Sequence, residues 1–169
     1  MNKAPNIFDY ATSELSQDAF ICWLISWLEY DDKHELKDAA KAFVAFLYRV
    51  GYVTKKSTKS INVGNLEVVK NGKKIVLQYG KMDIFFIAVV DGNETGFIIE
   101  DKTDSGPHSN QLKKYVKYAE KHHPGLPLVK VYYKTGYLFN EDLNACKEAE
   151  FGILDCQKIY EFLRSIITD

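Results

Sequence analysis

Two long apolar runs dominate the middle of the chain, and each is typical of a strand that is buried on both faces. The runs cover Met82–Val90 and Thr95–Lys102, and continuous apolar stretches of this length predict strands inside a sheet. The short segment between them contains Gly92 and Asn93, and glycine supplies the positive φ that tight hairpin turns require. We therefore predict a β-hairpin with Gly92 and Asn93 at its tip.

The patterns on either side of this hairpin predict an α/β fold. Apolar residues recur at helical spacing over Leu15–Tyr30, His34–Val50, Ser109–His122, Asn140–Glu150 and Asp155–Ile167. Further strands are expected over Ile61–Val69, Lys74–Gln78, Leu128–Tyr133 and Phe151–Leu154. Because Leu128–Tyr133 follows a helix, we expect it to pair parallel to an earlier strand. The order predicts a mixed central sheet flanked by helices on both faces, in a single domain over residues 1–169.

The hairpin turn also determines which side chains meet across the two strands. With the turn placed at its predicted position, Asp83 faces Lys102 and Phe85 faces Glu100. Side chains alternate along a strand, so Asp83, Glu100 and Lys102 are expected on one face. Asp101 projects from the opposite face, which leaves its backbone carbonyl, rather than its side chain, available to the same site.

Two carboxylates beside an ammonium suit the hydrolysis of a phosphodiester. Carboxylates bind hard divalent cations such as Mg²⁺ or Mn²⁺, which activate water and stabilise charge on phosphate. Lys102 can orient or help to deprotonate the attacking water, and it can stabilise the transition state. The alternative is an exposed Asp–Lys cross-strand pair with a structural role only. Against it, strands that are buried on both faces rarely carry three charges without a reason.

The composition of the chain restricts which binding partners and which cellular location are expected for the protein. The 169 residues are 46% apolar and carry a net charge of −1, so a globular protein is expected without a general attraction to nucleic acid. Lysines nevertheless cluster within the segment 113–121, which leaves room for a local phosphate-binding stripe. No apolar run reaches the length of a membrane span, and the N-terminus lacks the apolar stretch of a signal peptide. The 3 cysteines have no metal-ligand spacing, and together these features favour a cytoplasmic protein without a membrane partner.

Asp83 and the later Glu100-Asp101-Lys102 are similar to the signature of the PD-(D/E)XK nuclease superfamily. Met82 stands where the named motif has proline. The core of that family, an αβββαβ arrangement, agrees with the predicted order of elements. The resemblance therefore implies a restriction-endonuclease-like α/β fold.

Two further matches lie outside the hairpin. Gln111 and Tyr115, on the next predicted helix, resemble the QxxxY motif of exonuclease-like and related branches of the family. Glu14 resembles the acidic residue that such members carry on their first core helix. The resemblance implies that Gln111 and Tyr115, with the neighbouring Lys113 and Lys114, support the site or contact the nucleic-acid backbone.

The resemblance also implies a mechanism and a substrate. Asp83 and Glu100 would bind the catalytic Mg²⁺ or Mn²⁺, the backbone carbonyl of Asp101 and Glu14 would complete the site, and Lys102 would be the catalytic lysine. We therefore predict a metal-dependent nuclease, with DNA rather than RNA as its nucleic-acid partner. The competing hypothesis is a catalytically silent nuclease-like domain that binds nucleic acid or protein. The sequence does not separate a monomer from a homodimer.

Overall fold

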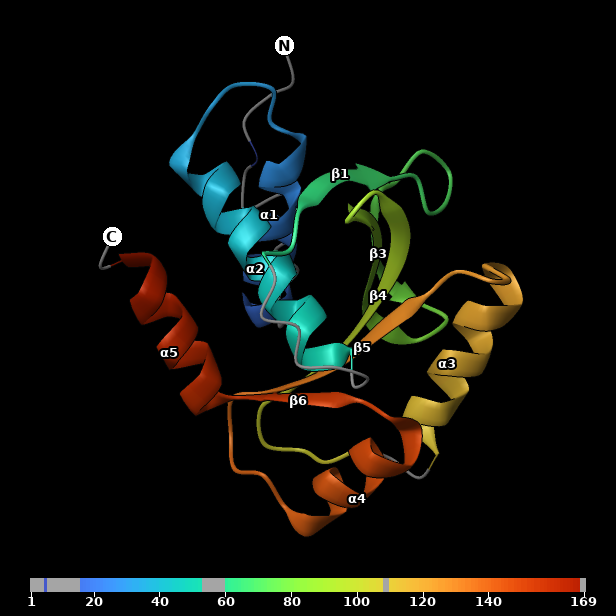
Figure 1. Cartoon of the computed structure of the whole chain (residues 1–169). Helices are drawn as coiled ribbons and strands as arrows, with labels where there is room; N and C mark the ends of the chain where they lie inside the picture. The colour runs from blue at the N-terminus through green and yellow to red at the C-terminus, as the bar shows by residue number, and fades with distance from the viewer. Residues whose placement is uncertain (1–4, 6–15, 53–59, 108–109, 168–169) are drawn as a thin grey trace.

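The computed structural model describes residues 5, 16–52, 60–107 and 110–167, which form an α/β protein (Figure 1). The helices are α1 (Ser16–Ser26), α2 (Glu35–Gly51), α3 (Gln111–His122), α4 (Asn140–Ala149) and α5 (Cys156–Ile167), with a 3₁₀ turn, η2 (Trp27–Glu29), after α1. The strands are β1 (Val63–Glu67), β2 (Ile75–Tyr79), β3 (Met82–Val90), β4 (Asn93–Lys102), β5 (Leu128–Lys134) and β6 (Gly152–Asp155). None of the helices in this described part is long and apolar enough to cross a membrane.

The strands form one 6-stranded mixed sheet in which β3 and β4 are central. β3 lies antiparallel to β4 on one side, and along its other edge it pairs with β2 and then with β1. β5 pairs parallel to β4, and β6 pairs parallel to β5. The parallel pairing expected for the strand that follows the 109–122 helix is therefore confirmed.

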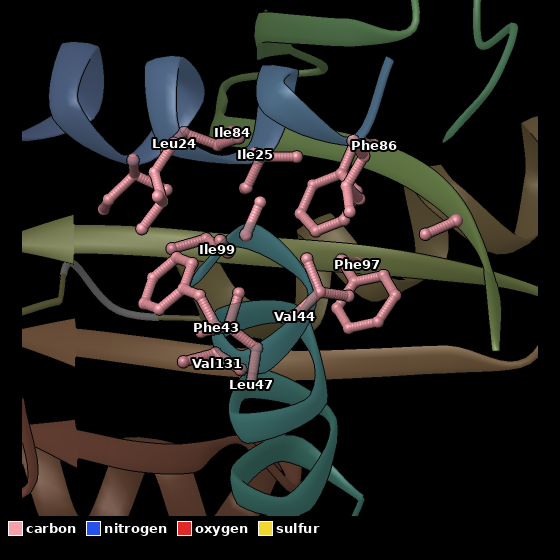
Figure 2. Close-up of a cluster of buried hydrophobic side chains, with 14 of the residues drawn as sticks. Leu24, Ile25, Phe43, Val44, Leu47, Ile84, Phe86, Phe97, Ile99 and Val131 are labelled. Carbon is pink, nitrogen blue, oxygen red and sulfur yellow. The ribbon is translucent and has the colours of Figure 1, made fainter. Parts of the chain in front are cut away.

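Helices cover both faces of this sheet, as predicted (Figure 1). α1 and α2 pack on one face, where Ile25 and Leu47 belong to the same cluster as Phe86 (Figure 2). α3 and α4 cover the opposite face, where Leu112 packs in a cluster with Phe85. Because both faces are buried, β3 and β4 are apolar at most positions, and this explains the continuous apolar runs in the sequence.

The hairpin turn lies one residue earlier than predicted. Asp91 and Gly92 occupy its two central positions with φ of 48° and 81°, and Val90 pairs with Asn93. Both central residues of a type I′ turn need positive φ, which aspartate tolerates and glycine adopts without strain. The sequence Asp-Gly therefore forms the turn in preference to Gly-Asn.

The corrected register changes the neighbour of Asp83 but not its face. Phe85 lies opposite Ile98 rather than Glu100, and continuation of the same ladder places Asp83 opposite Glu100 instead of Lys102. A shift of two residues preserves the alternation of side chains, whereas a shift of one would reverse it. Asp83, Glu100 and Lys102 therefore still belong to one face of the sheet.

The first helix is shorter than the predicted 15–30 segment, of which the structure describes residues 16–30. α1 ends at Ser26, whose hydroxyl donates a hydrogen bond of 2.6 Å to the carbonyl of Trp23. Such back-bonding competes with the helical ladder and often bends the chain. The backbone then tightens into η2 before α2 begins.

Candidate active site

The carboxyl end of β4 and the beginning of β3 lie side by side because the two strands are antiparallel. Glu100 and Lys102 belong to the sheet face that α3 covers, whereas Asp101 belongs to the face that α1 covers. Asp83 joins the first pair, and its Oδ2 accepts a hydrogen bond of 2.9 Å from the backbone N–H of Asp101. The structure thus brings together the three side chains that the sequence placed on one face.

Glu100 has a fully buried carboxylate that is paired with Lys102 but accepts no hydrogen bond from the described residues. Its Oε1 lies 2.6 Å from Nζ of Lys102, but the contact lacks hydrogen-bond geometry, and neither oxygen accepts a hydrogen bond from the described residues. Burial and then the negative charge of Asp83 raise the pKa of Glu100 to about 7, although Lys102 opposes the shift. A buried carboxylate is costly unless it is paired and hydrogen-bonded. Glu100 therefore has unused capacity to bind a cation.

Asp83 is held in position from two sides. In addition to the backbone N–H of Asp101, the side-chain amide of Gln78 donates a hydrogen bond of 3.1 Å to Oδ1 of Asp83. Gln78 has a φ of 54°, a left-handed conformation that is uncommon for residues other than glycine. Both oxygens of Asp83 are thus oriented by the β2–β3–β4 framework.

Lys102 is a cation in this environment. Its side chain is only 16% exposed, and burial by itself would lower the pKa of its ammonium. Glu100 first, and then Asp83 and Asp101, more than compensate, so that the pKa of Lys102 lies above its ordinary value. The site therefore presents a fixed positive charge beside two carboxylates.

The opposite face of β4 is tied to α1 through Gln17. The side-chain amide of Gln17 donates a 2.5 Å hydrogen bond to Oδ1 of Asp101, and its carbonyl accepts a 3.0 Å hydrogen bond from the hydroxyl of Thr135. The backbone N–H of Thr135 in turn donates to the carbonyl of Lys102 over 3.2 Å. These contacts hold the end of β4 between α1 and the segment that follows β5.

Asp18 forms a carboxyl pair with Asp101 on this face. Asp18 is 2% exposed, and burial, followed by the charge of Asp83, raises its pKa. Burial and then the charge and hydrogen bond of Asp18 raise the pKa of Asp101. Two acids in contact, of which Asp18 is buried and Asp101 half-buried, cannot both ionise easily, so the pair retains a proton at neutral pH.

The sequence patterns did not predict this pairing of Asp18 with Asp101. A signal was present, because Asp18 lies three and four residues before Ile21 and Cys22, on the apolar face of α1. Both of those neighbours are fully buried. An acid on the buried face of a helix needs a partner, although the sequence cannot say which one.

Gln111 and Tyr115 form the wall of the site on the α3 side. The side-chain amide of Gln111 donates a hydrogen bond to the hydroxyl of Tyr115, which is 3% exposed. Burial, and next the charge of Glu100, raise the pKa of Tyr115 far above its ordinary value. The phenol is therefore protonated and lies within electrostatic reach of Glu100.

The remaining predicted residues lie farther out or outside the described part of the chain. Lys113 forms an ion pair of 2.7 Å with Glu148 of α4, and Lys114 is exposed on α3. Glu14 lies outside the described residues. The structure thus places Lys113 in a contact between helices and leaves Lys114 accessible to solvent.

A buried lysine next to Lys102 was also missed by sequence reasoning. Lys134 pairs with Lys102 across the parallel β4–β5 ladder, is fully buried, and donates a 2.7 Å hydrogen bond to the carbonyl of Ser105. Its Nζ lies 3.9 Å from Oδ2 of the buried Asp142, and Oδ1 of Asp142 accepts a 2.6 Å hydrogen bond from Tyr132. This network supports the loop that follows β4, the strand that carries two of the candidate catalytic residues.

The donor set fits a hard divalent cation. No group of three or more His, Cys, Asp and Glu side chains within the described ranges is placed to hold a metal ion. Mg²⁺, however, usually takes only one or two carboxylates and fills its other positions with water and phosphate oxygens. Asp83 and Glu100 supply two, and the oxygens of Glu100 without hydrogen bonds are the observation that makes them fit.

Comparison with known proteins gives one result. A family model described as the PD-(D/E)XK nuclease superfamily matches residues 5–169, whereas no curated protein and no solved structure shows a significant match. The match covers nearly the whole chain, and the mixed sheet with helices on both faces is consistent with the restriction-endonuclease-like fold. The match does not identify a branch within the superfamily. The chain therefore belongs to the PD-(D/E)XK nuclease superfamily.

Proposed function

We propose that the protein is a metal-dependent nuclease that hydrolyses phosphodiester bonds in DNA. The observation that carries the proposal is the buried carboxylate of Glu100, which has no hydrogen bond within the described residues. Glu100 lies opposite Asp83 on continuation of the β3–β4 ladder and forms an ion pair of 2.6 Å with Lys102. Membership of a nuclease superfamily supports the same reaction.

Asp83 and Glu100 would hold Mg²⁺ or Mn²⁺, together with the backbone carbonyl of Asp101 and the carboxylate of Glu14. When bound, the ion would lower the pKa of a water molecule and stabilise negative charge on the phosphate. Asp83 is already oriented by Gln78 and by the N–H of Asp101. This preorganisation reduces the cost of assembling the site around a substrate.

Lys102 would orient the attacking water and stabilise the charge that develops on the phosphate. Because the surrounding carboxylates raise the pKa of Lys102, its ammonium donates hydrogen bonds at neutral pH and has no free electron pair with which to accept a proton. Its 16% exposed side chain has little conformational freedom, so its charge is fixed in the site before the substrate arrives.

Gln111 and Tyr115 would support the wall beside Glu100, in the manner of the QxxxY branch. The hydrogen bond between them fixes the phenol, and burial keeps it protonated. Lys114, exposed on α3, and Lys113, once released from Glu148, would attract the nucleic-acid backbone. A cytoplasmic location belongs to the same proposal.

A cleavage assay tests the proposal directly. Purified protein is incubated with linear, circular and single-stranded DNA and with RNA, in the presence of Mg²⁺, Mn²⁺ or EDTA. We expect cleavage of DNA with either metal and none with EDTA, and we expect Lys102→Ala to abolish it. Lys33→Ala is the matched control, because Lys33 is exposed in the segment between η2 and α2, outside the lysine cluster of α3.

Intact substrates under every condition would overturn the nuclease proposal and favour the silent binding module. Equal cleavage by the wild type and by Lys102→Ala would show a contaminating nuclease or a different active site. Circular dichroism of each variant must match the wild type, so that a loss of cleavage reports on chemistry and not on unfolding.

A further inference from the structure

A pair of exposed aromatic side chains lies on the loop that is hydrogen-bonded to the carboxyl end of β4. Tyr137 and Phe139, in the loop between β5 and α4 (orange in Figure 1), are 75% and 49% exposed. Their ring centroids are 5.0 Å apart in an edge-to-face arrangement. Aromatic side chains are costly to leave in water, and adjacent exposed ones often mark a binding surface.

The loop that carries these rings is firmly attached to the end of β4. The backbone N–H of Thr135 donates a 3.2 Å hydrogen bond to the carbonyl of Lys102. Gly136 lies so close to Thr103 that a Cβ at this position would approach the Thr103 carbonyl oxygen to 2.1 Å. Thr135, which contacts the backbone of Lys102 directly, therefore lies only two residues before Tyr137 in the sequence.

The far end of the loop is held as well. The backbone N–H of Phe139 donates a 2.8 Å hydrogen bond to Asp142, and Nζ of the buried Lys134 lies 5.8 Å from the centroid of the Phe139 ring. Phe139 thus covers Lys134, while Tyr137 packs against the Phe139 ring and remains largely exposed. A ring that is held in place and exposed loses little conformational entropy when it binds a ligand.

The charges around the loop indicate which part of a nucleic acid would meet Tyr137. Asp104 is exposed, and its Oδ1 lies 3.4 Å from the position of a Cβ on Gly136. Glu141, in the first turn of α4, is exposed as well. These acids would repel a phosphate, whereas the flat face of a base carries no charge and stacks well on an aromatic ring.

We propose that Tyr137 stacks on an unpaired base of the strand that is cleaved, so that the substrate is single-stranded or carries an unpaired nucleotide at the cleavage point. In a duplex both faces of each internal base are covered by its neighbours, which leaves no face for the ring. The inference rests on the proposed nuclease function and specifies its substrate class.

Equilibrium binding tests this inference. The full chain is titrated, with Ca²⁺ in place of Mg²⁺ to prevent cleavage, into fluorescein-labelled oligothymidine, oligouridine and a fully paired DNA duplex with blunt ends. We expect tighter binding of the single strands than of the duplex. Tyr137→Ala should weaken single-strand binding roughly ten-fold, whereas Tyr137→Trp should retain it. Tyr160→Ala is the matched control, because Tyr160 is 63% exposed on α5.

Salt dependence separates stacking from charge. The loss caused by Tyr137→Ala should be the same fold-change at low and at high salt, since stacking releases no counterions. A strand with 2-aminopurine at one position should show a change in base fluorescence with the wild type that Tyr137→Ala abolishes.

The possible failures are distinguishable. Equal affinities of wild type and Tyr137→Ala for the single strands would overturn the stacking inference and leave the nuclease proposal intact, as would an equal loss of affinity for single strands and duplex. If the wild type neither binds nor cleaves any nucleic acid, both proposals fail.

Discussion

The neighbouring acids Asp101 and Glu100, on the two faces of β4, have different contacts. On the α1 face, the carboxylate of Asp101 accepts a hydrogen bond from Gln17 and forms a carboxyl pair with Asp18. On the α3 face, the carboxylate of Glu100 accepts no hydrogen bond from the described residues and has Lys102 as its close ionic neighbour. Burial raises the pKa of both carboxyls. The oxygens of Glu100 accept no hydrogen bond from the described residues, although Oε1 lies 2.6 Å from Nζ of Lys102.

Under the proposed function, Asp101 is a structural acid and Glu100 a metal-binding one. The Asp101 side chain fixes the end of β4 against α1, and its backbone N–H orients Asp83. Glu100, one residue earlier, presents its carboxylate to the opposite side. Alternation of side chains along a strand thus places two consecutive acids in different surroundings.

The largest expected effect is on catalysis, through the α3 face. Asp83→Asn keeps the size and an acceptor for the N–H of Asp101, but removes the charge that would help to hold a cation. We expect the single-turnover rate of DNA cleavage to fall about 10³-fold, equivalent to about 4 kcal/mol of transition-state stabilisation. Asp32→Asn, at an exposed position, should cleave at the wild-type rate. If Asp83→Asn cleaves at a rate comparable to that of the wild type, Asp83 does not bind the metal.

The next effect is on metal-dependent stability. At a Mg²⁺ concentration 100 times the dissociation constant, the free energy of unfolding of the wild type should rise by about 2.7 kcal/mol. Glu100→Gln should abolish this rise. Without metal, the same variant should be more stable than the wild type at pH 8, by about 1–2 kcal/mol, because the raised pKa of Glu100 means that the folded protein favours the neutral carboxyl even beside Lys102. Urea unfolding with and without Mg²⁺ measures both changes in the free energy of unfolding. If Mg²⁺ stabilises Glu100→Gln as much as the wild type, Glu100 does not bind the metal.

The pH dependence of stability reports on both faces. The pKa of Glu100 is raised from 4.5 to about 7, and the pKa values of Asp18 and Asp101 are raised as well, so the folded protein binds protons more tightly than the unfolded chain. The stability from these neutral acids is complete below about pH 4 and is lost as the pH rises through 7. Without metal, the free energy of unfolding should therefore decrease between pH 5 and pH 8.

Asp18→Asn sharpens this test because it removes one member of the carboxyl pair on the α1 face. The variant should lose about 1 kcal/mol less than the wild type over the same pH range, whereas Asp32→Asn should follow the wild-type curve. Equal pH slopes for Asp18→Asn and the wild type would show that the Asp18–Asp101 pair does not share a proton.

The smallest expected effect is at Gln17. Gln17→Ala removes the amide that bonds Asp101 and the acceptor for Thr135, and the free energy of unfolding should fall by about 1–2 kcal/mol. Because no contact with the α3 face is lost, the cleavage rate at saturating metal should change less than three-fold. A loss of cleavage as large as that of Asp83→Asn would show that the two faces are not separable.

The sequence predicted the fold class and the residues of the α3 face because both depend on local patterns. Apolar runs identified β3 and β4, and alternation placed Asp83, Glu100 and Lys102 on one face. The predicted register was wrong by two residues, since the turn forms at Asp91-Gly92, but a shift of two residues keeps that alternation.

The α1 face could not be predicted because its contacts join segments that are distant in the chain. Gln17 and Asp101 are 84 residues apart, and Gln17 and Thr135 are 118 residues apart. Their pairing depends on where α1 lies on the sheet, which hydrophobic spacing does not determine. The buried Lys134 and Asp142 were missed for the same reason, since charged residues in a sequence are expected at the surface.

The most direct test of the central claim compares the cleavage of DNA by Glu100→Gln and Asp101→Asn in Mg²⁺. Each variant replaces one acid of β4, the buried Glu100 or the half-buried Asp101, by its neutral isostere, on opposite faces of the strand. We predict that Glu100→Gln loses cleavage by about 10³-fold, while Asp101→Asn stays within about ten-fold of the wild type. Equal losses in the two variants, or a larger loss in Asp101→Asn, would contradict the division of β4 into a structural and a catalytic face.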